Sequence, residues 1–187
     1  MTGDWLADQR AELAAQRILD AAARLFAERG VANTQMADIA KAAGCSRATV
    51  YRYFENRHAV RLAFVHREAR RIGAEVVAEV DGIADPGERI VAAVLTAVRA
   101  VRADPLLIAW FRPADAGLAV EIGQSSEVIA ALATAFLPDS IAGDRDRAQL
   151  ARWLTRIVVS LLTVPGVDDA DERAMLEHFV APLFARA

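Results

Sequence analysis

The sequence has few of the residues that metal binding, disulfide bonding and catalysis require. It contains one cysteine and three histidines in 187 residues. A single cysteine excludes an intrachain disulfide framework and fits a reducing compartment. His58 and His66 lie on one helix and His178 is remote from both, so no metal triad is indicated. A glycine-rich phosphate loop is also missing, and we expect neither enzyme activity nor a cofactor.

Long uncharged apolar runs are missing as well. Although 55% of the residues are hydrophobic, no run reaches the roughly 18 residues that a membrane-spanning helix needs. Acidic residues interrupt the first twelve positions, so no signal peptide is indicated. We therefore expect a cytoplasmic protein with no membrane partner. The excess of apolar residues is largely alanine, which favours closely packed helices over strands.

The negative charge is not spread evenly along the chain. The net charge is −3, but residues 1–70 hold 11 Lys and Arg against 8 Asp and Glu, whereas residues 71–187 hold 11 against 17. A basic N-terminal part on an acidic remainder is typical of a protein that presents one surface to phosphates. Random fluctuation of charge explains the same split, so the pattern is supporting evidence only.

Apolar residues recur at helical spacing along nearly the whole chain, with neither β-alternation nor an internal repeat. The sequence therefore predicts an all-α fold of about nine helices after an N-terminal arm of residues 1–9. Glycine, proline and capping residues place the boundaries. The expected helices cover residues 10–29, two short segments within 34–54, and residues 55–80, 88–104, 106–111, 117–137 (one or two helices broken near Gly123), 144–162 and 169–185.

The stretch TQMADIAKAAGCSRATVYRYF, residues 34–54, predicts two short helices joined by a tight turn. We expect Thr34 to cap the first helix and Ser46 the second, with Gly44 supplying the left-handed turn between them. Val50 and Phe54 lie four residues apart and should point inward. The remaining side chains of the second helix are Arg, Thr, Tyr and Ala, which is the layout of a helix-turn-helix DNA reader.

Residues 17–65 resemble the N-terminal domain of TetR-type transcriptional regulators. Three positions depart from the usual family pattern without disturbing it: Cys45 replaces Val, Ala48 replaces Gly and Arg57 replaces Lys. The resemblance covers about a quarter of the chain and implies a helix-turn-helix domain at residues 10–56 and a ligand-binding and dimerisation domain at residues 57–187. It runs without gaps through Ala22, Leu25, Phe26, Gly30, Thr34, Ile39, Ala40, Ala43, Gly44, Ser46, Thr49, Tyr51 and Phe54.

The partner that this resemblance implies is double-stranded DNA. Arg47 and Arg52 can reach guanine edges, and the hydroxyl groups of this segment can donate to phosphates. Arg57 matches the family's phosphate-contacting Lys and adds bidentate geometry. The expected DNA-binding residues are Thr34, Gln35, Ser46, Arg47, Ala48, Thr49, Tyr51, Arg52, Tyr53 and Arg57.

Two further sites follow from the resemblance. Members of the family bind a small-molecule inducer in the middle region, and an apolar lining here would suit a hydrophobic ligand; ordinary core packing is the alternative. The candidate pocket residues are Leu95, Leu107, Trp110, Phe111, Phe136 and Trp153. The last two long helices would form a four-helix bundle with a second subunit, unless their stripes only pack within the chain. The candidate dimer residues are Leu150, Leu154, Ile157, Val158, Leu161, Leu176, Phe179, Val180 and Leu183.

Two classes of function remain open at this point. One is a homodimeric, ligand-responsive DNA-binding regulator, most often a repressor that leaves a palindromic operator when its inducer binds. The other is a helical small-molecule carrier or interaction module that keeps a vestigial reader. The five polar reader positions Arg47, Thr49, Tyr51, Arg52 and Arg57 favour the regulator, because a carrier has no need of them. Cys45 is either a packed small side chain or a redox sensor.

Overall fold

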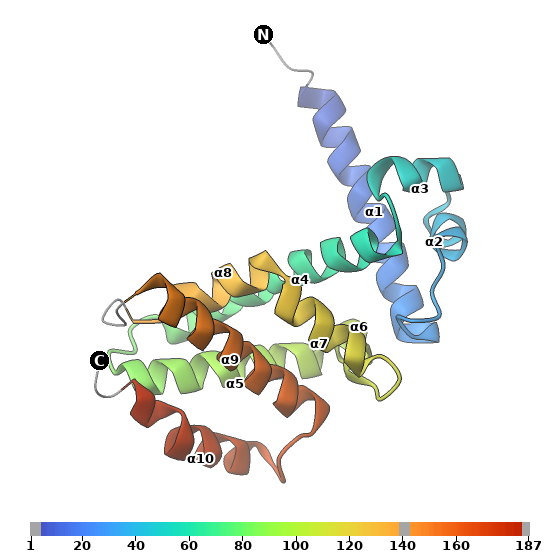
Figure 1. Cartoon of the computed structure of the whole chain (residues 1–187). Coiled ribbons are helices and arrows are strands. Elements are labelled where there is room, and N and C mark those ends of the chain that lie inside the picture. The colour runs from blue at the N-terminus through green and yellow to red at the C-terminus, as the bar shows by residue number, and fades with distance from the viewer. Residues whose placement is uncertain (1–4, 139–142, 185–187) are drawn as a thin grey trace.

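The computed structural model describes residues 5–138 and 143–184 (Figure 1). These residues form ten α-helices and two 3-10 helices and include no strand, which confirms the all-α prediction. The elements in chain order are α1 (Trp5–Arg29), α2 (Met36–Ala43), α3 (Arg47–Tyr53), α4 (Arg57–Val80), α5 (Pro86–Ala103), α6 (Pro105–Ile108), η1 (Ala109–Phe111), α7 (Ala116–Ser125), α8 (Glu127–Ala135), α9 (Asp144–Thr163), α10 (Asp169–Phe179) and η2 (Ala181–Leu183).

Helices α1, α2 and α3 form a small N-terminal unit, and α1 projects beyond the other two (Figure 1). Gly30 ends α1 with a φ of 86°, a left-handed conformation that glycine adopts without a steric cost. Gly44 turns the chain between α2 and α3 in the same way, with a φ of 70°. The apolar faces of the three helices meet around Phe26, Ile39 and Val50, each of which is fully buried.

Helix α4 joins this unit to the rest of the molecule. Asn56 caps its first turn, since the side-chain Oδ1 accepts a hydrogen bond from Ala59 N at 2.9 Å. Val60 and Phe64 at its start complete the N-terminal core, whereas Val76 and Val80 near its end pack against α5. One continuous helix therefore belongs to both parts of the molecule (Figure 1).

The C-terminal body is a stack of helices around α5 and α9. Helix α5 packs against α4, α9 and α10, while α7 and α8 pack against α9. Arg102 of α5 holds the connection between α9 and α10: its guanidinium donates to both carboxylate oxygens of Glu172, at 2.9 and 2.6 Å, and to Leu161 O at 2.9 Å. The Arg102 guanidinium lowers the pKa of Glu172, whose side chain is buried and also accepts from Gly166 N.

Packing continues across the expected domain boundary at residue 57. Leu107 and Trp110 of the C-terminal part share one buried cluster with residues of α1. The indole ring of Trp110 stacks on Phe64 at 5.8 Å and meets the edge of Phe26 at 5.3 Å, measured between ring centroids. The segment 105–111 is thus packed against the N-terminal unit as well as against the C-terminal body to which it belongs.

Three expected helix boundaries were wrong. The N-terminal arm is already helical from Trp5. The break between α7 and α8 falls at Ser126 rather than near Gly123, because the Ser126 hydroxyl accepts a hydrogen bond from Ile129 N and caps α8. The last helix ends at Phe179 and a 3-10 turn follows at 181–183, while the expected end at residue 185 lies outside the described residues.

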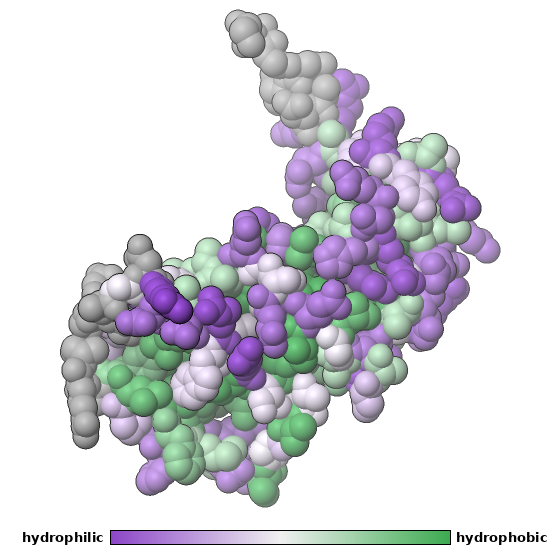
Figure 2. Space-filling view, in the orientation of Figure 1, coloured by the Kyte–Doolittle hydropathy of each residue, from purple (hydrophilic) through white to green (hydrophobic). Residues whose placement is uncertain are grey.

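The surface of the molecule differs between its two parts (Figure 2). Hydrophilic side chains gather over the unit formed by α1 to α3, and hydrophobic ones are more frequent over the C-terminal body. Within the described ranges, none of the helices combines the length and the apolar character needed to cross a membrane.

Candidate nucleic-acid interface and apolar cavity

Helix α3 presents a short polar face to solvent. Its N-cap is Ser46, as expected, since the side-chain Oγ accepts a hydrogen bond from Thr49 N at 3.1 Å and lies 2.9 Å from Thr49 Oγ1. Val50 and Phe54 point inward, as their spacing predicts. The helix is thereby held from one side, and Arg47, Ala48, Tyr51 and Arg52 stay exposed on the other.

Arg52 and Tyr53 restrain one another at the end of α3. The Arg52 guanidinium lies 5.1 Å from the centroid of the Tyr53 ring, and its Nη2 is 3.3 Å from the Tyr53 hydroxyl oxygen. Tyr53 itself is half-buried against the N-terminal core. Such a contact limits the rotamers of the Arg52 side chain before any partner binds, which reduces the entropy lost on binding.

The expected role of Thr34 was wrong in both respects. Thr34 is fully buried, and its hydroxyl donates to Gly30 O at 2.9 Å. The N-cap of α2 is the next residue, the exposed Gln35, whose backbone N–H donates to Asp38 Oδ2 at 3.2 Å. Side-chain contact with DNA is therefore open to Gln35 but not to Thr34.

The segment of residues 30–35, which we call the α1–α2 loop, is held by hydrogen bonds to charged side chains of α4 and of the C-terminal part. From the α4 side, Arg57 Nη1 donates to Ala32 O at 2.9 Å and Arg61 Nη2 donates to Val31 O at 2.7 Å. Burial, together with the nearby Arg57 guanidinium, lowers the pKa of Arg61. Arg57 keeps further N–H groups for a phosphate, since a guanidinium carries five.

From the C-terminal part, the same loop is held by Asp115. This residue is 3% exposed, and its carboxylate accepts hydrogen bonds from Val31 N at 3.2 Å and Ala32 N at 2.8 Å. Arg112 nearby donates to Ala27 O in α1 at 2.9 Å. Sequence reasoning missed Asp115, because a single Asp before a helix reads as an ordinary cap, and its side chain makes no cap hydrogen bond here.

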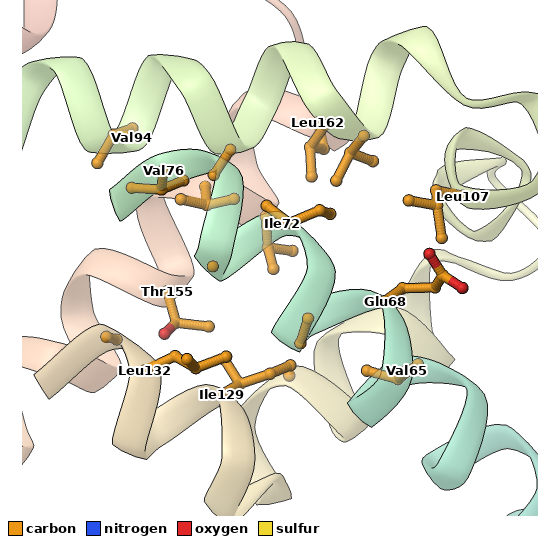
Figure 3. Close-up of a pocket in the computed structure, with 18 of the residues that line it drawn as sticks. Val65, Glu68, Ile72, Val76, Val94, Leu107, Ile129, Leu132, Thr155 and Leu162 are labelled. Carbon is orange, nitrogen blue, oxygen red and sulfur yellow. The ribbon is translucent and has the colours of Figure 1, made fainter. Parts of the chain in front are cut away.

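An apolar cavity of about 250 Å³ lies in the C-terminal body, between α4, α5, α8 and α9 (Figure 3). Four expected pocket residues line it, namely Leu107, Trp110, Phe111 and Phe136. Two do not. Leu95 is buried on the other side of α5 in the core shared with α9 and α10, and Trp153 is 39% exposed on the outer face of α9.

Most of the wall was not predicted, because it comes from helices that the sequence assigned to other roles. Helix α4 contributes a full face, with Val65, Ile72 and Val76 among those shown in Figure 3. Leu154 and Val158 of α9, expected at a dimer interface, line the cavity instead. A signal was present in the small residues that line the space and leave it unfilled: Ala69, Ala93, Ala97, Ala119, Gly123 and Ala133.

The other dimer candidates divide by burial. Leu161, Leu176 and Val180 are buried in the core of their own chain, and a residue in that position cannot also meet a partner, so these assignments were wrong. Leu150 and Ile157 are half-buried beside that core. Phe179 and Leu183 are 68% and 57% exposed and remain candidates.

Polar groups are scarce in the cavity. Glu68 reaches it near Leu107 (Figure 3), with 13% of its side chain exposed. Its Oε1 and Oε2 accept from Arg67 Nε at 2.9 Å and Arg71 Nε at 2.8 Å, and the bond to Glu68 raises the pKa of Arg71. Thr155 donates its hydroxyl to Ala151 O.

Comparison with known proteins supports this picture. The sequence pattern described as bacterial regulatory proteins, tetR family, matches residues 18–64. An uncharacterized HTH-type transcriptional regulator of Mycobacterium tuberculosis is 50% identical over 186 residues, which cover 98% of this chain and 92% of that protein.

Two solved structures show the same fold. The TetR family repressor AlkX from Dietzia sp., implicated in biodegradation of n-alkanes, superposes with a TM-score of 0.67 and 21% identity over 92% of this chain and 96% of that one. The regulator FadR from Bacillus subtilis, in complex with stearoyl-CoA, gives a TM-score of 0.60 and 17% identity over 91% and 97%. At these identities the likeness concerns the fold alone.

Proposed function

Because this chain belongs to the tetR family of bacterial regulatory proteins, we propose that it is a homodimeric repressor released from a palindromic operator by a small apolar inducer. The family consists of DNA-binding transcriptional regulators rather than enzymes. The observation that carries the proposal is the place of α4, which starts beside the α3 reader, grips the α1–α2 loop and forms one wall of the cavity.

The exposed face of α3 would enter the major groove of DNA and contact the edges of the bases. Arg47 and Arg52 offer guanidinium groups to guanine edges or phosphates, and Tyr51 offers a hydroxyl. Ala48 between them brings the helix backbone close to the bases, because its side chain is a single methyl group. One helix of this length reads only a few base pairs, so two copies about one turn of DNA apart supply the specificity.

The two copies would meet through the outer faces of α9, α10 and η2. Exposed large apolar side chains are found there, in contrast to the inner stripe that the sequence suggested. Such side chains on the surface of a chain are typical of a protein interface. We assign the interface to Trp153, Met175, Phe179 and Leu183, with the half-buried Leu150 and Ile157 beside them.

Release from the operator would follow from the two sets of hydrogen bonds that hold the α1–α2 loop, one from α4 and one from Asp115. A ligand that pushes α4 away from α8 and α9 displaces Arg57 and Arg61, which hold the loop carbonyls. Displacement of Trp110, which lines the cavity, would also move the following segment, in which Arg112 N donates to Ala109 O and Asp115 N donates to Arg112 O, and so disturb the contacts of Asp115 with the loop. Only a ligand that prefers the displaced arrangement shifts the population, and a coupling of about 2–3 kcal/mol suffices for a strong response.

Binding to DNA duplexes from the region upstream of the protein's own coding sequence tests the proposal, with a shuffled duplex of equal length as reference at two salt concentrations. We expect a preference for one palindromic site that survives the higher salt, since nonspecific charge binding weakens steeply with salt. Arg47→Ala should weaken specific binding by about 1–3 kcal/mol.

The matched control is Arg99→Ala, which removes an exposed arginine from α5 far along the chain from the reader. Its operator affinity should equal that of the unchanged protein. Equal and salt-sensitive binding to every duplex, including fragments selected from the whole genome, contradicts the regulator assignment.

A further inference from the structure

Gly73 lies in the interior of α4, although its backbone conformation does not require a glycine. The glycines with a positive φ in the described part of the chain are Gly30, Gly44, Gly82 and Gly143, whereas Gly73 has the ordinary helical conformation. Glycine inside a helix is destabilising relative to alanine. The reason for a small residue at this position therefore lies in the side chain that faces it.

Leu132 of α8 lies directly over Gly73. Gly73 is buried, and a Cβ atom added to it would lie 3.0 Å from Leu132 Cδ2, 3.5 Å from Cδ1 and 3.8 Å from Cγ. The first distance is shorter than the optimal separation of two carbon atoms, which is about 3.5–4.0 Å. Because both methyl groups of Leu132 lie near the same point, rotation about its last bond would only exchange one for the other. An added methyl group thus has no room while α4 and α8 keep their present spacing.

Helix α8 is fixed to the C-terminal body, so α4 is the helix that would move. The Ser126 hydroxyl caps the first turn of α8. At the other end, Arg147 of α9 donates to Thr134 O at 3.3 Å, Leu137 O at 3.4 Å and Pro138 O at 2.6 Å. Helix α4, in contrast, continues out of the body into the N-terminal unit (Figure 1). Repulsion between α8 and a larger side chain on α4 would therefore displace α4.

The contact belongs both to the cavity wall and to the helix that leads to the DNA-binding unit. Gly73 and Leu132 line the cavity, and Figure 3 shows Leu132 there. Arg61, which donates to Val31 O in the α1–α2 loop, precedes Gly73 in the same helix by about 18 Å at 1.5 Å per residue. A continuous helix thus connects the contact with the hydrogen bonds that hold the loop.

From this contact we propose that Gly73 is a positioning residue that sets the DNA-binding position of α4. Its missing side chain lets α4 lie against Leu132, and an effector acts by separating the two residues. The inference rests on the proposed function, because it takes the cavity as the effector site and the displacement of α4 as the response. It assigns that response to one pair of residues.

Gly73→Ala tests the assignment in calorimetric titrations of the full chain with propylbenzene, without DNA. A dry cavity of about 150 Å³ accepts benzene, so a cavity of about 250 Å³ accommodates this probe. The added methyl group disfavours the close position of α4, and a tenfold effect would raise the displaced population from about 1% to about 10%. Since apparent affinity scales with the competent fraction, the variant should bind propylbenzene about tenfold more tightly.

Operator binding reports the other arrangement of α4. With about 90% of the protein still in the close position, Gly73→Ala should keep its operator affinity within about twofold. Release from the operator should then need only about one tenth of the propylbenzene concentration. Gly73→Val carries two methyl groups on a stiff χ1, and it should lower the operator affinity itself about threefold or more.

Gly117→Ala is the matched control. Gly117 lies in α7, and an added Cβ atom would have no neighbour within 4 Å, so both affinities should equal those of the unchanged protein. A double-mutant cycle tests the dependence on Leu132. In a Leu132→Ala background, Gly73→Ala should no longer raise the affinity for propylbenzene, because its methyl group then has room.

Alanine favours a helix over glycine, so Gly73→Ala should retain the helicity measured by circular dichroism. Equal or weaker binding of propylbenzene by the variant overturns the inference, because Gly73 would then serve close packing alone. Binding by neither protein, or a tenfold gain that persists in the Leu132→Ala background, overturns it as well. A tenfold gain without easier release from the operator contradicts the proposed release and not the role of Gly73 in positioning α4.

Discussion

Replacing Asp115 by asparagine tests the grip of the C-terminal part on the α1–α2 loop. The carboxylate accepts from Val31 N and Ala32 N at 3.2 and 2.8 Å in a site that is 3% exposed. The substituted side-chain amide would keep one oxygen for one of these N–H groups, but its NH₂ group would face the other, donor against donor.

The cost can be worked from those two hydrogen bonds. One charge-assisted bond is lost and leaves a buried N–H unpaired, which costs about 1.5–3 kcal/mol. The second bond becomes a neutral one and loses about half its strength, or about 1 kcal/mol. Asp115→Asn should therefore lower the free energy of unfolding by about 2–4 kcal/mol.

Urea denaturation followed by circular dichroism measures this change through the midpoint at constant slope. The exposed Asp81→Asn at the end of α4 is the control and should change the free energy by less than about 0.5 kcal/mol. If Asp115→Asn lowers the free energy of unfolding no more than the control does, the carboxylate does not hold the α1–α2 loop, and its proposed role in linking the C-terminal part to the loop is refuted. Operator affinity of the variant then shows whether the same contact positions the reader.

Three further outcomes are expected. Glu172→Gln should reduce the loss of thermal stability that the protein shows as the pH is lowered. The hydrogen bond from Arg102 lowers the pKa of Glu172, so this carboxylate stabilises the fold above its unfolded pKa, and the stabilisation is lost as the pH falls through the lower folded pKa. Thermal melts across acidic pH measure the difference. Phe179→Glu with Leu183→Glu should give monomers in sedimentation without loss of helicity, whereas an intact dimer places the interface elsewhere. Gly44→Ala should cost about 1–2 kcal/mol in chemical denaturation, because the added methyl group is strained at a φ of 70° even though no neighbour obstructs it, and an unchanged midpoint argues against that conformation.

The local features of the reader could be predicted because each depends on one or two residues. Ser46 and Asn56 cap helices through their own side chains, and Gly44 adopts a conformation that few other residues tolerate. Val50 and Phe54 follow from helical spacing alone. No knowledge of the remaining chain was needed for these positions.

Contacts between distant segments could not be predicted in this way. Thr34 and Gln35 are both polar residues ahead of a helix, and the loop conformation decides that Thr34 turns inward to Gly30 O while Gln35 becomes the cap. Asp115 lies more than eighty residues from the amide groups that it binds, and the sequence around it resembles any turn.

Helical periodicity shows which face of a helix is buried but not what lies opposite. Leu154 and Val158 of α9 repeat at the spacing of a dimer seam, yet they face a cavity. The reason lies in the opposing helix α5, where Ala93 and Ala97 stand at positions that a larger side chain would otherwise fill. The small residues that indicated close packing of helices therefore also line the cavity. The same residue type allows two helices to pack closely where it faces a neighbouring backbone, and leaves a space for a ligand where it faces other small side chains.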